Sequence, residues 1–259
     1  MVLDIILEKI KTEDFQNQID SIYQFNGQLV PRVTHILSAM LHEDYLMNWA
    51  NSLGWKRQNY KKTLETAADK GSFVHNSIEN YIQEGVEPDF SLVNPEIKQE
   101  VYNAYNSFLL WWEIISQNQI EIVMQEQTLI CPYFGGTLDL LLSINGNMYL
   151  FDFKTSNNPS YKYFMQLSIY RYMLKTIYNI DLAGVGIIML DKKSIHFEEI
   201  MAFTTNEFDL SFINACQESF LSLVYAYYNR LRVEQLYKEL MDRRKGDGGD
   251  TSADCINQK

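Results

Sequence analysis

The stretch GGTLDLLLSINGNMYLFDFKTS, residues 135–156, contains two apolar runs on either side of Asn145-Gly146. An Asn-Gly pair between apolar runs is the strongest short-range signal for a two-residue hairpin turn, because both turn residues adopt positive φ there. If Ile144 pairs with Asn147, the turn also fixes the register of the two strands. The sequence therefore predicts an antiparallel hairpin at this position.

This register places four polar side chains in facing pairs. Asp139 lies opposite Asp152, with Cβ atoms about 5 Å apart, and Thr137 lies opposite Lys154. Two facing carboxylates in apolar strands repel each other and are costly to bury. A divalent cation bridging Asp139 and Asp152 would compensate for this cost. In the alternative interpretation the pair occupies a solvated sheet edge, and Lys154 only screens its charge.

The segments around the hairpin alternate between strand and helix patterns. Alternation with a period of two indicates strands, and apolar residues spaced three and four apart indicate helices. We expect further strands at 120–130, 183–190 and 195–203, and helices at 67–83, 96–117, 161–179 and 206–243. This order predicts an α/β fold with α+β character, in which helices flank a central mixed β-sheet.

The first part of the chain is expected to be helical. Residues 3–24 and 31–54 carry apolar positions at helical spacing. Residues 1–66 are therefore predicted to form a helical elaboration, in front of a core over 67–244 that includes the long C-terminal helix. The tail, 245–259, has little apolar content and is expected to be disordered.

A basic cluster, Lys56, Arg57, Lys61 and Lys62, lies just before the core. Such a cluster can contact a phosphate backbone, or it can form an ordinary solvated surface. The net charge of −11 argues against a protein that coats nucleic acid through bulk electrostatics. Any contact with nucleic acid is therefore expected to be local.

The composition indicates an intracellular protein with one large core. The chain has 259 residues, of which 46% are hydrophobic. Its cysteines, Cys131, Cys216 and Cys255, are widely spaced and form no CxxC pair, so we expect reduced thiols in a cytoplasmic protein. The initial stretch, MVLDIILEKIKTEDF, carries acidic residues and no basic start, so neither a signal peptide nor a membrane anchor is expected.

Five hairpin residues, Gly136, Asp139, Asp152, Phe153 and Lys154, follow the pattern G-x-x-D and then D-x-K. This pattern resembles the core motif of the PD-(D/E)XK nuclease superfamily. The resemblance implies that Asp139, Asp152 and the Phe153 carbonyl bind Mg²⁺ or Mn²⁺, and that Lys154 assists phosphodiester hydrolysis. Gly136 would let a phosphate approach closely, although a β-bulge explains a glycine equally well.

Two flanking motifs resemble the RecB-like exonuclease branch of this superfamily. In KGSFVHNSIENYI, Gly71, His75 and Glu79 stand four apart on one helical face, and the branch places a metal-binding histidine on such a helix. His75 is thereby implied as a further ligand. Gln166 and Tyr170 match the Q-x-x-x-Y motif of the branch and are implied to contact DNA or steady the site. The alternatives are a structural histidine and a pair that caps a helix–sheet interface.

Glu79 and Glu126 are additional acidic candidates. Glu79 shares the helical face of His75, and Glu126 lies on the strand that precedes the hairpin. Glu126 is either a further metal ligand or a surface residue.

The resemblance implies a metal-dependent exonuclease that hydrolyses single- or double-stranded DNA ends, for repair, recombination or phage DNA processing in a bacterial or phage-infected cell. A structure-specific endonuclease of the same fold and a non-catalytic DNA-end-binding protein are the alternatives. Some relatives carry four cysteines for an iron–sulfur cluster, and this chain, with three, is expected to hold none. No membrane partner is expected, and the sequence does not identify any protein that the chain binds.

Overall fold

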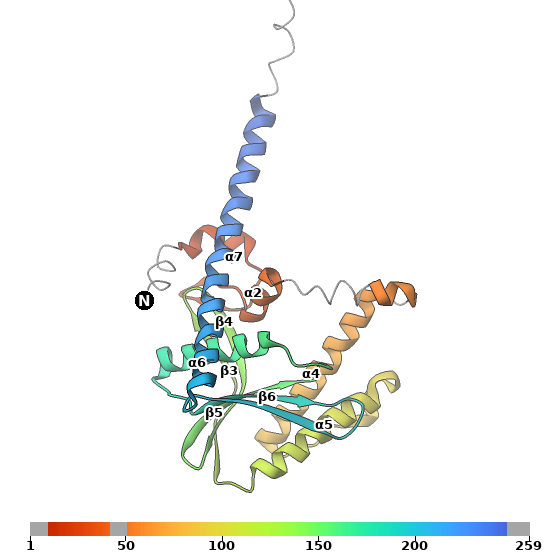
Figure 1. Ribbon diagram of the computed structural model, residues 1–259. Helices are drawn as coiled ribbons and strands as arrows, with labels where there is room; N and C mark the ends of the chain where they lie inside the picture. The colour runs from red at the N-terminus through yellow and green to blue at the C-terminus, as the bar shows by residue number, and fades with distance from the viewer. Residues whose placement is uncertain (1–9, 42–50, 58, 248–259) are drawn as a thin grey trace, which may run out of the picture.

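The computed structural model describes residues 10–41, 51–57 and 59–247. Its centre is a five-stranded sheet in the order β3-β4-β5-β6-β7, with helices on both faces (Figure 1). β5 and β6 are parallel, and the other neighbouring pairs are antiparallel. The predicted α/β class with a mixed sheet is confirmed. The strands are β3 Ile120–Cys131, β4 Phe134–Ile144, β5 Asn147–Lys154, β6 Gly184–Leu190 and β7 Phe197–Phe203.

The predicted hairpin turn between β4 and β5 is present. Asn145 and Gly146 have φ values of 50° and 83°, and Ile144 pairs with Asn147. This left-handed backbone is why the sequence needs an asparagine and a glycine here.

The β4–β5 ladder is shorter than the sequence predicts. It ends at the pair Leu140–Phe151, so the facing pairs expected beyond it, of Asp139 with Asp152 and of Thr137 with Lys154, are not formed. Beyond that point β4 continues to pair with β3, whereas β5 continues to pair with β6. The two strands therefore separate at the position where the predicted site lies.

One face of the sheet is covered by α6 (Tyr161–Tyr178), α7 (Glu207–Asp247) and α2 (Val33–Met40). α6 connects the parallel strands β5 and β6, as a parallel pair requires a crossover. Apolar side chains of the sheet, such as Leu150 and Ile187, share a buried cluster with residues of α6 and α7. This packing fixes α6 against the end of β5.

The opposite face is covered by α4 (Tyr60–Glu84) and α5 (Pro95–Ile115). α5 starts at a proline behind the N-cap Asn94, whose side chain accepts the Glu96 N–H. The rings of this cluster pack edge to face, with Trp111 and Phe151 centroids 5.1 Å apart and Phe108 and Phe153 centroids 5.5 Å apart. The aromatic core holds α4 and α5 against β5.

The expected helix over 3–24 is wrong within the described residues. Thr12–Gln18 forms the 3-10 helix η1, and β1 (Gln24–Phe25) pairs with β2 (Gln28–Leu29). The turn between these strands is again an Asn-Gly pair, Asn26 and Gly27, with positive φ. A short 3-10 helix, η2, spans Phe90–Leu92.

The other expected boundaries are met in part. Of the helix predicted over 31–54, α2 and a helical segment at 51–55 are observed, whereas 42–50 lies outside the described residues. α4 runs without a break through the expected domain boundary at 66 and 67. α7 continues to Asp247 and so includes the start of the tail expected to be disordered; 248–259 lie outside the described residues.

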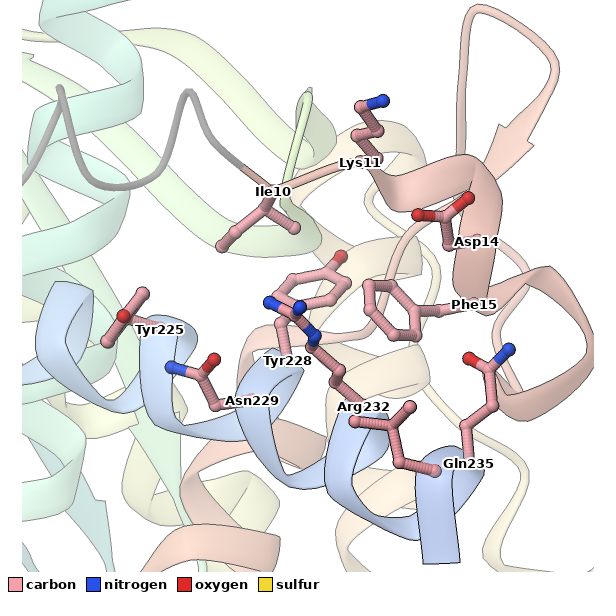
Figure 2. A pocket seen from close by; sticks show the side chains of 10 residues that line it. Ile10, Lys11, Asp14, Phe15, Tyr225, Tyr228, Asn229, Arg232 and Gln235 are labelled. Atoms are coloured by element: carbon pink, nitrogen blue, oxygen red, sulfur yellow. The ribbon is translucent and has the colours of Figure 1, made fainter. Parts of the chain in front are cut away.

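α7 extends beyond the body of the fold (Figure 1). Near the point where it leaves, a cavity of about 600 Å³ lies between α7 and the first described residues (Figure 2). Phe15 and Tyr228 line it together with the charged Lys11, Asp14 and Arg232. None of the predicted site residues lines this cavity.

Among the described helices, none combines the length and the apolar character that crossing a membrane requires.

Candidate functional site

The separation of β4 and β5 is bridged by a side chain. The Phe153 N–H, which no longer meets the β4 backbone, donates to Asp139 Oδ2 at 2.8 Å. Asp139 is nearly buried, with 10% of its side chain exposed. Its carboxylate therefore takes the place of a backbone acceptor and is fixed between the two strands.

Asp152 forms a buried ion pair with Lys154 on β5. Its Oδ2 lies 2.7 Å from Lys154 Nζ, and the residue is 1% exposed. Asp152 Oδ1 meets no hydrogen-bond donor in the described part of the chain. Burial raises the pKa of Asp152 to about 6, and Lys154 counteracts this only in part. A buried carboxylate oxygen without a donor favours the approach of a cation.

Lys154 is held as an ammonium group. Burial alone would lower its pKa, but the carboxylates of Asp152 and Asp139 raise it above its ordinary value. Its Nζ also donates to Gln166 Oε1 at 3.4 Å and lies 5.1 Å from the centre of the Tyr163 ring. Lys154 is therefore a positioned cation and hydrogen-bond donor.

His75 reaches the same place from α4. Its Nε2 lies 3.0 Å from the Phe153 carbonyl oxygen, and its Nδ1 lies 3.5 Å from Asp139 Oδ2. The imidazole also packs edge to face on the Phe153 ring, which orients it. Three of the predicted ligand groups, from His75, Asp139 and the Phe153 backbone, are thus brought together.

Glu126 joins this group from β3. His75, Glu126 and Asp139 each offer a ligand atom within 4.8 Å of the others. Glu126 lies between the ladder pairs Gln125–Leu140 and Gln127–Leu138, with a φ of 44° that is unusual for a side-chain-bearing residue in a strand. It is half-buried rather than fully exposed.

The carboxylate of Glu126 is costly to ionise in this position. Burial, followed by the charges of Asp139 and Glu79, raises its pKa to about 8. Glu79 is half-buried and its side chain accepts from Gln83, so it acts on the group through its charge. Crowded, desolvated carboxylates of this kind are typical of a site that binds a divalent cation.

Gln166 and Tyr170 support Lys154 from α6. Gln166 accepts from Lys154 and donates to the Tyr170 hydroxyl at 3.4 Å, and both residues are buried. A Cβ at Gly136 would collide with the Tyr170 hydroxyl and lie 2.7 Å from the ring. Glycine is needed here to make room for the tyrosine, and substrate contact at Gly136 stays a prediction.

Sequence reasoning missed two tyrosines near the site. Tyr163 lies on α6 one turn before Gln166, and its place on the helical face of Gln166 and Tyr170 is a signal that could have identified it. Tyr23 shares a hydrogen bond with Thr137, with 3.0 Å between the oxygens. These two residues are 114 positions apart, and nothing local indicates the contact.

The donor set fits Mg²⁺ or Mn²⁺. Asp139, Glu126 and Asp152 supply hard carboxylate oxygens, and Phe153 supplies a carbonyl oxygen beside the nitrogen of His75. Asp152 lies outside the tight three-residue group and is connected to it through the charges of His75 and Asp139. The orphaned Asp152 Oδ1 and the crowded carboxylates are the features of this structure that a bound cation would satisfy.

Comparison with known proteins leaves the family open. No protein-family model matches the chain. No curated protein matches it either. Among solved structures, the crystal structure of SSO0001 aligns with 86% of each chain at 14% sequence identity and a TM-score of 0.37. Similarity at this level is too low to assign an activity.

Proposed function

We propose that this chain is a divalent-metal-dependent deoxyribonuclease of the PD-(D/E)XK type. The observation that carries the proposal is the convergence of Asp139, His75 and the Phe153 carbonyl beside the buried Asp152–Lys154 pair. An exonuclease that acts on DNA ends is the specific form favoured, by the resemblance of His75, Gln166 and Tyr170 to the RecB-like motifs.

Asp139, Asp152, His75 and the Phe153 carbonyl would hold Mg²⁺ or Mn²⁺, with Glu126 as a further acidic ligand. A divalent cation bound there would polarise the scissile phosphate and lower the pKa of water. The hydrogen bond from Phe153 N–H to Asp139 keeps one ligand in place before the cation arrives.

Lys154 would donate to the phosphate or to the attacking water. Because its pKa is raised, it remains charged and can offset negative charge that develops on the phosphorus centre. Asp152 and Gln166 fix the ammonium group from two sides, so little reorganisation is needed. Of the two roles open to Lys154 from sequence, orienting water and deprotonating it, this geometry favours the first.

The test is hydrolysis of end-labelled DNA, single- and double-stranded, linear and circular, with Mg²⁺, with Mn²⁺ and with a chelator. We expect cleavage that requires the metal and a free end. Cleavage of circular DNA would instead support the endonuclease alternative, and DNA binding without cleavage by either metal would overturn the enzyme proposal.

The Lys154→Ala variant separates catalysis from binding. It should lose cleavage and keep DNA binding, because Lys154 acts on the reacting phosphate rather than on the distant strand. The variant also leaves Asp152 without its cation, so circular dichroism must show that it is folded. Retained activity in a folded Lys154→Ala protein would refute the assigned role.

A further inference from the structure

The start of α4 and the described segment before it, residues 51–57, carry an exposed basic and aromatic surface. Trp55 is 89% exposed, and the four members of the basic cluster, Lys56, Arg57, Lys61 and Lys62, are exposed as well. Figure 1 shows this end of α4 extending away from the sheet. The next cation along the helix, Lys70, is paired with Glu100 at 2.9 Å, whereas Lys61 forms no ion pair in the described part of the chain. An exposed basic cluster is unusual in a protein with a net charge of −11.

Lys61 lies on the same face of α4 as His75. The two residues are separated by 14 positions, which on an α-helix corresponds to about 21 Å along the axis and about 40° around it. The exposed residues Leu64, Ala68 and Ser72 lie between them and are uncharged, whereas the exposed Glu65 borders this face beside Lys61, about 80° around the helix from His75. An anionic strand can therefore run from Lys61 over Leu64 and Ala68 toward His75, on the side of this face away from Glu65.

Trp55 supplies the second recognition element. A nearly fully exposed indole beside basic side chains offers a platform on which an unpaired base can stack, while the cations contact phosphates. Bases inside a duplex are already stacked on their neighbours, so such a platform favours a single strand. An exposed tryptophan near lysines could also rest on an anionic lipid surface. The uncharged residues Leu64, Ala68 and Ser72, which lead toward His75, favour the nucleic acid.

We propose that Trp55 and Lys61 form a contact surface for single-stranded DNA, which holds an unpaired stretch of the substrate about 20 Å from the metal group along α4. The direction of the strand toward His75 rests on the proposed nuclease function; the contact itself rests on the exposed indole and the unpaired cation. The surface would raise the affinity for the substrate without taking part in hydrolysis.

Lys62 provides a matched control. It is adjacent to Lys61 and also exposed, but it is displaced by about 140° around the helix from His75. Lys61→Ala and Lys62→Ala therefore remove the same charge from the same helix on different faces. Trp55→Phe, which keeps an aromatic ring, is the conservative partner of Trp55→Ala.

The experiment measures the fluorescence anisotropy of labelled oligothymidylate with the full chain carrying Lys154→Ala, which blocks cleavage, over a series of salt concentrations. Lys61→Ala should weaken binding several-fold and reduce the salt slope by about 0.7, the value of one phosphate contact on a single strand. Trp55→Ala should weaken binding about tenfold or more, and Trp55→Phe should restore most of it. Lys62→Ala should bind like the parent, and duplex DNA should respond little to Trp55→Ala.

Three outcomes would overturn the proposal: equal losses from Lys61→Ala and Lys62→Ala, no loss from Trp55→Ala, or Trp55-dependent binding to phosphatidylserine vesicles in place of oligothymidylate. Cleavage assays use chains that carry Trp55→Ala or Lys61→Ala and keep Lys154. They distinguish failure of the contact surface from failure of the nuclease proposal. A KM for single-stranded DNA that is insensitive to Trp55→Ala and Lys61→Ala removes only the contact surface. Binding through Trp55 and Lys61 with no cleavage in Mg²⁺ or Mn²⁺ supports the surface and removes the nuclease.

Discussion

Asp139 Oδ2 accepts the backbone N–H of Phe153 at 2.8 Å, at the point where β4 and β5 stop pairing. The Asp139 carboxylate therefore has a structural and an electrostatic role. It satisfies a backbone donor that the separated strands leave without a partner, and it presents charge to His75 and Glu126. Structure and chemistry at this residue can be separated by substitution.

Asp139→Asn should fold like the parent and lose activity. The asparagine side-chain oxygen can still accept the Phe153 N–H, but the charge that attracts a cation is gone. Asp139→Ala leaves that N–H without an acceptor and should lower the free energy of unfolding by about 1–3 kcal/mol. Urea denaturation with a chelator present measures the free energy of unfolding of both variants. Equal destabilisation by Asn and Ala would show that the hydrogen bond does not stabilise the separated strands.

The buried acids should make the metal-free protein less stable as the pH rises. The pKa of Glu126 is raised from 4.5 to about 8, and that of Asp152 is raised to about 6. A raised carboxyl pKa means that the folded state binds the proton more tightly than the unfolded state. The resulting stability is fully present below pH 4.5 and is lost as the pH increases through 8.

Glu126→Gln should remove part of this pH dependence. With a chelator present, its Tm should fall less than that of the parent as the pH is raised from 4.5 to 8. Glu121→Gln, an exposed change on the same strand, is the control and should follow the parent. Thermal unfolding followed by circular dichroism provides the comparison. If Tm depends on pH identically in the parent, Glu126→Gln and Glu121→Gln, the pKa of Glu126 is not raised by its surroundings.

Local signals in the sequence predicted much of the fold. The Asn145-Gly146 turn fixed the hairpin, because its backbone requirement is met within two residues. The same signal at Asn26-Gly27 identifies the β1–β2 turn, but its flanking strands are only two residues long and carry little apolar pattern. Within the described residues, the helix expected over 3–24 was wrong because the chain forms only the short 3-10 helix Thr12–Gln18 there and enters β1 at Gln24.

The site could be predicted in its members but not in its geometry. The motif spacing identified Asp139, Asp152 and Lys154, which the structure brings together with His75. Register alone placed the two aspartates face to face, and it failed because the Asp139 side chain replaces a backbone partner. Glu126 could not be placed from sequence, since its position depends on an unusual backbone conformation within β3.

His75→Ala should weaken metal binding. Loss of outer-shell partners of metal ligands costs about 10–100-fold in affinity, so loss of a ligand should raise the Mg²⁺ concentration for half-maximal cleavage by about tenfold or more. The increase in Tm that Mg²⁺ produces should shrink accordingly. His196→Ala, an exposed histidine elsewhere on the surface, is the control. An unchanged Mg²⁺ dependence would leave His75 with only its structural contact to the Phe153 carbonyl.

Gly136→Ala tests whether this glycine makes room for Tyr170 or for substrate. A Cβ at Gly136 would lie 2.7 Å from a Tyr170 ring carbon and still closer to the hydroxyl. Overpacking of this kind should lower the free energy of unfolding by about 1–3 kcal/mol. Gly54→Ala, whose Cβ would meet nothing within 4 Å, is the control for a glycine-to-alanine change.

Tyr170→Phe completes a double-mutant cycle, because it removes the hydroxyl that Gly136→Ala would strike. Gly136→Ala should therefore cost less in the Tyr170→Phe background than in the parent, with a coupling energy of about 0.5 kcal/mol or more. Loss of the Gln166–Tyr170 hydrogen bond in Tyr170→Phe should also slow cleavage by loosening the support of Lys154. Unchanged stability with a raised KM in Gly136→Ala would show instead that the substrate, not the tyrosine, needs the space.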